Sequence, residues 1–116
     1  MDFNAAILAH KKWKDRIRHS IESGEQLDAA VIAKDDQCDL GRWIQAAGSE
    51  ERALAEFGEV KAKHARFHEV AAETVRQTRG MSKAQADAVL VGPTAYGIAS
   101  AACVSAITAL RDKIQK

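Results

Sequence analysis

Residues 49–77, SEERALAEFGEVKAKHARFHEVAAETVRQ, decide the fold class of this chain. Apolar side chains and two histidines recur there at three- and four-residue steps, which is the spacing of one helix face. Ser49 and the two glutamates after it are typical of a helix N-terminus, and Arg79-Gly80 marks the end. The stretch therefore predicts a long helix to about Gln77, with the inward stripe Leu54, Phe57, Val60, His64, Phe67, Ala71 and Val75.

Residues 2–22 predict a second long helix on the same grounds, and Ser23-Gly24 stops it. Its stripe is Phe3, Ile7, His10, Trp13, Ile17 and Ile21. A histidine therefore lies near the middle of the apolar face of this helix as well.

Shorter pieces are predicted between these two helices. Residues 28–34 suit a short helix, and DDQCDLG, residues 35–41, is a turn-rich loop. Asp39 then caps a short helix over 40–47, which Gly48 closes.

The C-terminal part predicts a last helical stretch with a break or kink. Ser82 and Gln85 have the spacing of a capping box, and Gly92-Pro93 interrupts the stretch. A heptad spacing follows, formed by Tyr96, Ser100, Cys103, Ile107, Leu110 and Ile114.

These elements predict an all-α fold, and no segment alternates like a strand. Aromatic residues make up only 5% of the 116 residues and alanine is frequent, which also favours helix. We expect one domain over residues 1–116, an antiparallel four-helix bundle with a short extra helix or loop that carries Cys38.

Charge and hydropathy exclude several classes of partner. The net charge is +1, which gives no electrostatic case for binding nucleic acid or an anionic membrane. No apolar run approaches the roughly 20 residues that span a bilayer, so no membrane insertion is expected. The N-terminus is not a secretory signal, and two cysteines without such a signal indicate a reduced, cytoplasmic protein.

The pair His64 and His68 is the first chemical signal. Four residues separate them, so both rings project from one side of a helix and can meet one tetrahedral ion. Taken alone, a core histidine more often bonds a backbone carbonyl or a carboxylate. The pair flanks Phe67 within an apolar stripe, which favours a metal site instead.

His10 and Cys38 complete a tetrahedral set. His10 lies at a depth that a partner helix can match, and a glycine after the cysteine, Gly41, lets the backbone turn the sulfur inward. A thiolate lowers the net charge of a zinc site from +2 to +1, which eases burial.

Two residues compete for these roles. His19 lies off the main stripe between Arg18 and Ser20, so we interpret it as a surface residue. Cys103 lies on the last heptad stripe, where a buried cysteine acts as a small hydrophobe, although it is the other thiol able to replace Cys38.

Enzyme chemistries fit poorly, so we expect no enzyme. A di-iron bundle needs Glu-x-x-His pairs, and no glutamate precedes a histidine at that spacing. A hydrolytic zinc site needs an open position for water, which Cys38 closes.

Three motifs together resemble the chemoreceptor zinc-binding domain family, called CZB. They are HKKWK from His10, CDLGRW from Cys38 and HARFH from His64, and the resemblance covers roughly residues 5–111. It implies a bacterial cytoplasmic four-helix bundle and carries the zinc ligands of the family onto His10, Cys38, His64 and His68. Family members are joined to chemoreceptor signalling domains or to diguanylate cyclases, respond to zinc or to oxidants such as hypochlorous acid, and in some cases form homodimers.

Two uses of such a site remain open, besides a plain helical interaction module in which the metal is incidental. Zinc is either a structural staple of an interaction module, or the centre of a switch in which Cys38 leaves the metal on oxidation. The resemblance favours the switch in bacterial signalling of the chemotaxis or cyclic-di-GMP type. We expect one Zn²⁺ per chain, although copper and cobalt also accept these ligands. We expect Trp13, Trp43, Gly41 and Phe67 around the site, although ordinary core packing explains the two tryptophans equally well. We assign Lys14 no role.

Overall fold

The computed structural model describes residues 1–34, 36 and 38–115, and all regular structure in these ranges is helical. This confirms the all-α prediction for the described part of the chain. The helices, in chain order, are α1 (Phe3–Ser23), α2 (Ala29–Ile32), α3 (Asp39–Ala46), α4 (Ser49–Arg52), α5 (Ala55–Thr78), α6 (Lys83–Leu90) and α7 (Ala95–Ile114).

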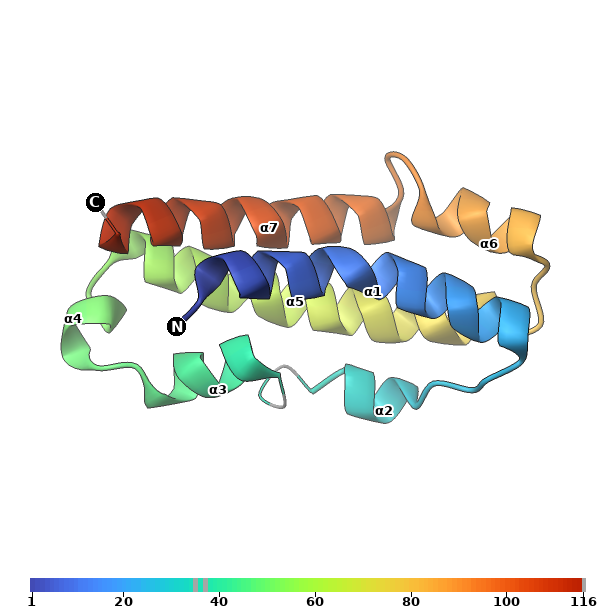
Figure 1. Ribbon diagram of the computed structural model, residues 1–116, viewed down its shortest axis with the longest axis horizontal. Helices are drawn as coiled ribbons and strands as arrows, with labels where there is room; N and C mark the ends of the chain where they lie inside the picture. The colour runs from blue at the N-terminus through green and yellow to red at the C-terminus, as the bar shows by residue number, and fades with distance from the viewer. Residues whose placement is uncertain (35, 37, 116) are drawn as a thin grey trace.

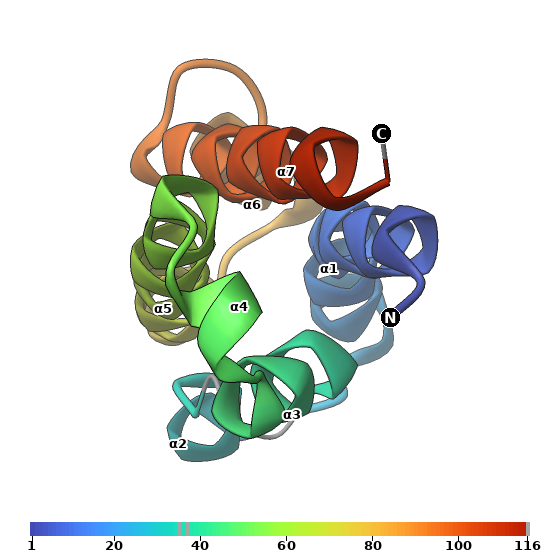
Figure 2. The same ribbon diagram turned by 90° about the vertical axis from the view of Figure 1, so that its left-hand side faces the viewer.

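The chain runs back and forth along the long axis of a molecule that measures 46 × 25 × 19 Å. Helices α1 and α5 run in the same direction, and α7 returns in the opposite one (Figure 1). After α1, the short helices α2, α3 and α4 lead the chain back along the molecule to the point where α5 begins. Seen end-on, α1, α5, α7 and this line of short helices surround a common interior (Figure 2).

Helices α1 and α6 have well-formed ends, of which the glycine stop of α1 and the capping box of α6 were predicted. Asp2 caps α1 by accepting a hydrogen bond from the Ala5 N–H at 3.0 Å, and Gly24 ends the helix with φ of 76°, in the left-handed region that glycine tolerates. Ser82 and Gln85 form the predicted capping box of α6. The predicted break at Gly92-Pro93 separates α6 from α7.

The long helix predicted from Ser49 is wrong at its start. The chain forms the single turn α4 and then bends at Leu54, whose backbone is extended, before α5 begins. Tertiary contacts explain the bend, because Arg52 reaches back to the end of α3. Its guanidinium donates to the carbonyls of Ile44, Gln45 and Ala47 at 2.9–3.0 Å.

The segment around the cysteine also differs from its prediction. Residues 39–41 are helical, and the cap of α3 is Cys38 where Asp39 was expected. The predicted loop also covers residues 35 and 37, which lie outside the described residues. Helix α2 is shorter than the predicted 28–34, and α3 ends at Ala46 before Gly48.

The predicted stripes form one core. Its fully buried side chains come from α1, α3, α5, α6 and α7 and include Ile17, Leu40, Val60, Phe67, Leu90, Tyr96, Cys103, Ile107 and Leu110. Ile114, the last member of the C-terminal heptad stripe, is 40% exposed.

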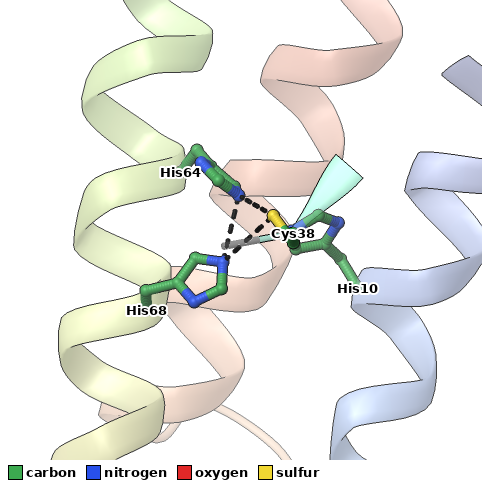
Figure 3. A group of neighbouring side chains, drawn as sticks. All are labelled: His10, Cys38, His64 and His68. Carbon is green, nitrogen blue, oxygen red and sulfur yellow. Dashed lines mark hydrogen bonds between the residues drawn. The ribbon is translucent and has the colours of Figure 1, made fainter. Parts of the chain in front are cut away.

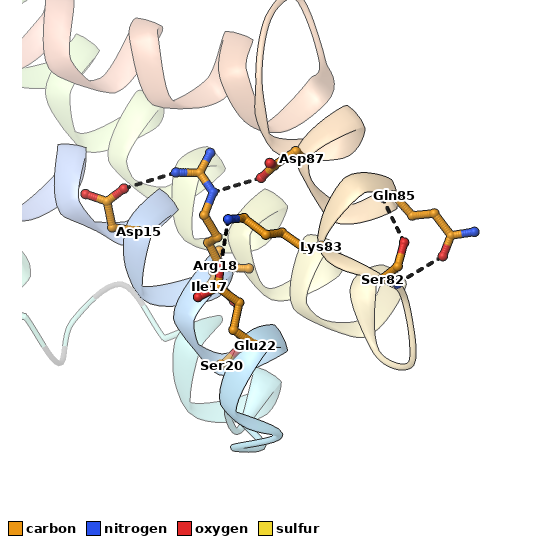
Figure 4. Close-up of polar contacts among 9 residues, drawn as sticks. All are labelled: Asp15, Ile17, Arg18, Ser20, Glu22, Ser82, Lys83, Gln85 and Asp87. Atoms are coloured by element: carbon orange, nitrogen blue, oxygen red, sulfur yellow. Dashed lines mark hydrogen bonds and ion pairs between the residues drawn. The ribbon is translucent and has the colours of Figure 1, made fainter.

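Ion pairs fasten α6 to α1 (Figure 4). The guanidinium of Arg18 contacts Asp87 at 2.8 Å and Asp15 at 3.5 Å, while Lys83 pairs with Glu22 at 3.3 Å. The Arg18–Asp87 and Lys83–Glu22 pairs join α6 to the second half of α1, whereas the Arg18–Asp15 pair lies within α1.

No single helix among the described residues is long and apolar enough to cross a membrane, although α6 and α7 pass the length and composition test together as a pair bent by 46°.

Candidate metal centre

Four side chains from three parts of the chain meet in the interior (Figure 3). His10 comes from α1, Cys38 from the start of α3, and His64 and His68 from α5. Each offers one ligand atom, and these atoms all lie within 4.8 Å of one another. The three histidines are almost fully buried and Cys38 is half-buried. These are the four residues that the sequence predicted as ligands.

The distances inside the group are close to those around a tetrahedral ion. The Nε2 atoms of His64 and His68 lie 3.0 Å apart, and Sγ of Cys38 lies 3.2 Å and 3.7 Å from them. With Zn–N near 2.05 Å and Zn–S near 2.3 Å, a tetrahedron separates two nitrogens by about 3.3 Å and nitrogen from sulfur by about 3.6 Å. Small shifts of these three side chains therefore suffice to place them around one ion, and the ligand atom of His10 lies within 4.8 Å of theirs.

Backbone carbonyls orient two of the rings. The Nδ1–H of His10 donates to the Ala6 carbonyl at 2.7 Å, and the Nδ1–H of His68 donates to the Ile32 carbonyl at 2.9 Å. In a neutral ring this leaves the lone pair on Nε2. The buried His10 Nε2 has no hydrogen-bond partner among the described residues, so it is an unsatisfied acceptor that a cation would complete.

His64 is the deepest of the four, at 0% exposure. Burial, together with the nearby rings of His68 and His10, lowers its pKa to about 3. Burial also lowers the pKa of His10, although the hydrogen bond to the Ala6 carbonyl acts in the opposite direction. Both rings are therefore neutral at pH 7, which is the state that binds a metal.

Cys38 lies where a loop becomes a helix. It is the N-cap of α3, and its Sγ accepts a hydrogen bond from the Gly41 N–H at 3.4 Å. The N-terminal end of a helix stabilises a thiolate over a thiol. Gly41 lies inside α3, so it contributes this N–H and does not act through the loop turn that the sequence suggested.

The residues expected around the site fall in different places. Phe67 is fully buried between ligand rings, with its centroid 5.3 Å from that of His10 and 5.6 Å from that of His68. Trp13 borders the same surface hollows as Cys38. The ring of Trp43 instead packs against Phe3 and Phe57, at 5.3 Å and 5.8 Å.

The two competing residues lie outside the four-residue group. His19 is exposed on α1. Cys103 is fully buried in the core on α7, and burial, with a smaller contribution from Cys38, raises its pKa to about 12. Its thiol is therefore protonated and suited to packing.

Sequence reasoning missed the carbonyls of Ala6 and Ile32. A backbone acceptor carries no residue-type signal. The Ala6 contact follows the four-residue helical spacing to His10 and could have been found, whereas the Ile32 contact joins residues 36 positions apart.

We expect the metal-free protein to lose stability as the pH falls below about 6.5. The unfolded chain binds protons at His10 and His64 near that ordinary pKa, whereas the folded chain resists them because burial lowers both pKa values. Urea unfolding in the presence of a chelator should give a lower midpoint at pH 5.5 than at pH 7.5. His64→Leu should reduce this difference, and a midpoint that rises on acidification would contradict the assignment.

The comparisons with known proteins agree with this geometry. Residues 10–75 match a family model described as the chemoreceptor zinc-binding domain. No curated protein and no solved structure gave a match. The matched segment contains all four residues of the group.

Proposed function

This chain belongs to the chemoreceptor zinc-binding domain family, and from that premise we propose that His10, Cys38, His64 and His68 hold one Zn²⁺ per chain. The observation that carries the proposal is the convergence of their four ligand atoms within 4.8 Å. Three imidazoles and one thiolate suit zinc, and together they fill its four positions. Such a closed set leaves no place for a substrate water, so the proposed role is binding and not catalysis.

The proposed architecture is an antiparallel four-helix bundle that the metal fastens across three segments. Zinc would join α1, the start of α3 and α5. The carbonyl of Ile32 at the end of α2 would hold the His68 ring in place and so link α2 to the site. Metal binding would therefore add its free energy to folding of the whole arrangement over residues 1–116.

The proposed switch is Cys38. The histidines lie inside long helices and are almost fully buried, whereas Cys38 is half-buried at a loop-to-helix junction. Its sulfur can leave the metal without unwinding a long helix. A thiolate is also the form that an oxidant converts to sulfenic acid. Departure of the sulfur would release the start of α3 and so shift the packing of the bundle.

The proposed context is bacterial signalling in the cytoplasm, of the chemotaxis or cyclic-di-GMP type. The domain would regulate a chemoreceptor or a diguanylate cyclase, in the same chain or in another, alone or as a homodimer. The second candidate is a zinc-stapled interaction module without sensing. The hydrogen bonds that fix two of the histidine rings favour it, because they make the site rigid.

Cys38→Ser separates the two candidates. For the switch, we expect the variant to remain folded and to retain zinc through the three histidines with a weaker affinity, by at least tenfold. The parent, but not the variant, should release zinc on treatment with hypochlorous acid. Circular dichroism and a zinc-sensitive dye measure both results. A Cys38→Ser chain that unfolds would support the staple instead, and zinc release from the variant as fast as from the parent would exclude Cys38 as the switch.

A further inference from the structure

Two surface hollows border the four-residue group. The first, of about 570 Å³, is lined by His10 and Cys38 among others, and the second, of about 380 Å³, by Cys38 and His68. His64, at 0% exposure, borders neither. Cys38 is therefore the member of the group that faces both hollows, whereas His10 and His68 each face one.

Two further residues line both hollows, Trp13 and Arg16. They follow His10 on α1 by about one and two helical turns. The guanidinium carbon of Arg16 lies 4.7 Å from the ring centroid of Trp13, which is a cation–π contact. The stacked pair thus lies beside Cys38, between the hollows, with Trp13 half-buried and Arg16 exposed.

We propose that the Trp13–Arg16 pair forms the entrance to Cys38, and that Arg16 selects negatively charged small reagents for reaction at this sulfur. The inference deepens the proposed function, in which Cys38 is the responsive ligand. It adds that two side chains of α1 determine which chemical class of molecule reaches the thiolate.

The charges around the hollows support this selection. Among the described residues, two acidic and two basic side chains line the first hollow, and one acidic and two basic side chains line the second. Arg16 is the charged residue among them that lines both hollows. Removing the guanidinium lowers the charge around each hollow by one unit, so Arg16 contributes positive charge beside the sulfur in both.

Two methanethiosulfonates of opposite charge test the inference. The thiolate attacks the sulfenyl sulfur of the reagent, a mixed disulfide forms, and methanesulfinate leaves. The rates of Cys38 labelling by the sulfonatoethyl and trimethylammonioethyl reagents are measured by mass spectrometry on the metal-free full chain. We expect Arg16→Gln to lower the anionic-to-cationic rate ratio at least about threefold at low ionic strength. In about 1 M salt, where the Debye length is about 3 Å, the difference should largely disappear.

Matched variants define the outcome. Arg66→Gln removes the same charge from an exposed position on α5 that borders neither hollow, and it should leave the ratio unchanged. Trp13→Ala should accelerate both reagents. An unchanged ratio in Arg16→Gln, an equal fall in Arg66→Gln, or equal labelling of a Cys38→Ser chain would overturn the inference. The labelling uses metal-free protein, so its result can be interpreted whether or not the chain binds zinc. Failure to bind zinc would refute the proposed function alone.

Discussion

Zinc is expected to raise the melting temperature of the metal-free protein by roughly 12–20 °C when free zinc is about a thousand times the dissociation constant. A ligand that binds only the folded state at that excess stabilises it by about 4 kcal/mol. In a domain of this size each kcal/mol corresponds to about 3–5 °C. The physical reason lies in the geometry, because one ion would fasten α1, α3 and α5 together.

The double variant His64→Ala with His68→Ala should abolish this rise. It removes both ligands that α5 supplies, and the two remaining side chains cannot form a tetrahedral site. His19→Ala is the matched control, because it removes an exposed histidine outside the group and should keep the full shift. Differential scanning calorimetry with and without zinc measures the effect, and a double variant that retained the shift would refute this site.

Phe67→Ala should destabilise the protein by about 3–5 kcal/mol, even without metal, because a fully buried aromatic ring leaves a cavity. The ring contacts His10, His68 and Tyr96, with centroids 5.3–5.9 Å apart. Its loss should also loosen two ligands and weaken zinc binding. Urea unfolding with a chelator measures the first effect, and competition with a zinc dye measures the second.

Phe67→Leu is the matched variant for this position. It keeps most of the apolar volume, so we expect it to recover most of the stability. If Phe67→Ala bound zinc as tightly as the parent in the folded state, the ring would serve the core alone and would not support the ligands.

The long helices could be predicted because burial and helical spacing coincide in them. His10, His64 and His68 lie on apolar stripes with Ile17, Phe67 and Val75, and these positions are buried. The split between α4 and α5 could not be predicted. No glycine or proline marks Leu54, and Arg52 just before the bend bonds carbonyls at the C-terminal end of α3 and that of its cap residue Ala47, which a local pattern does not reveal.

The four-residue group was predicted from residue spacing and ligand chemistry, and the family resemblance pointed to the same four residues. Local rules misplaced the cap of α3, because aspartate is a common N-cap and a cysteine sulfur is an unusual one. For Trp43 the sequence left a place at the site and ordinary core packing equally open. Its ring lies against Phe3 and Phe57, as core packing requires.

Metal content of the purified protein tests the central claim most directly. Elemental analysis under native conditions should find about one zinc per chain in the parent and in His19→Ala, and much less in Cys38→Ala and His64→Ala. A parent chain that carries no zinc and takes up none when zinc is supplied would contradict the account, and so would ligand variants that bind as much zinc as the parent.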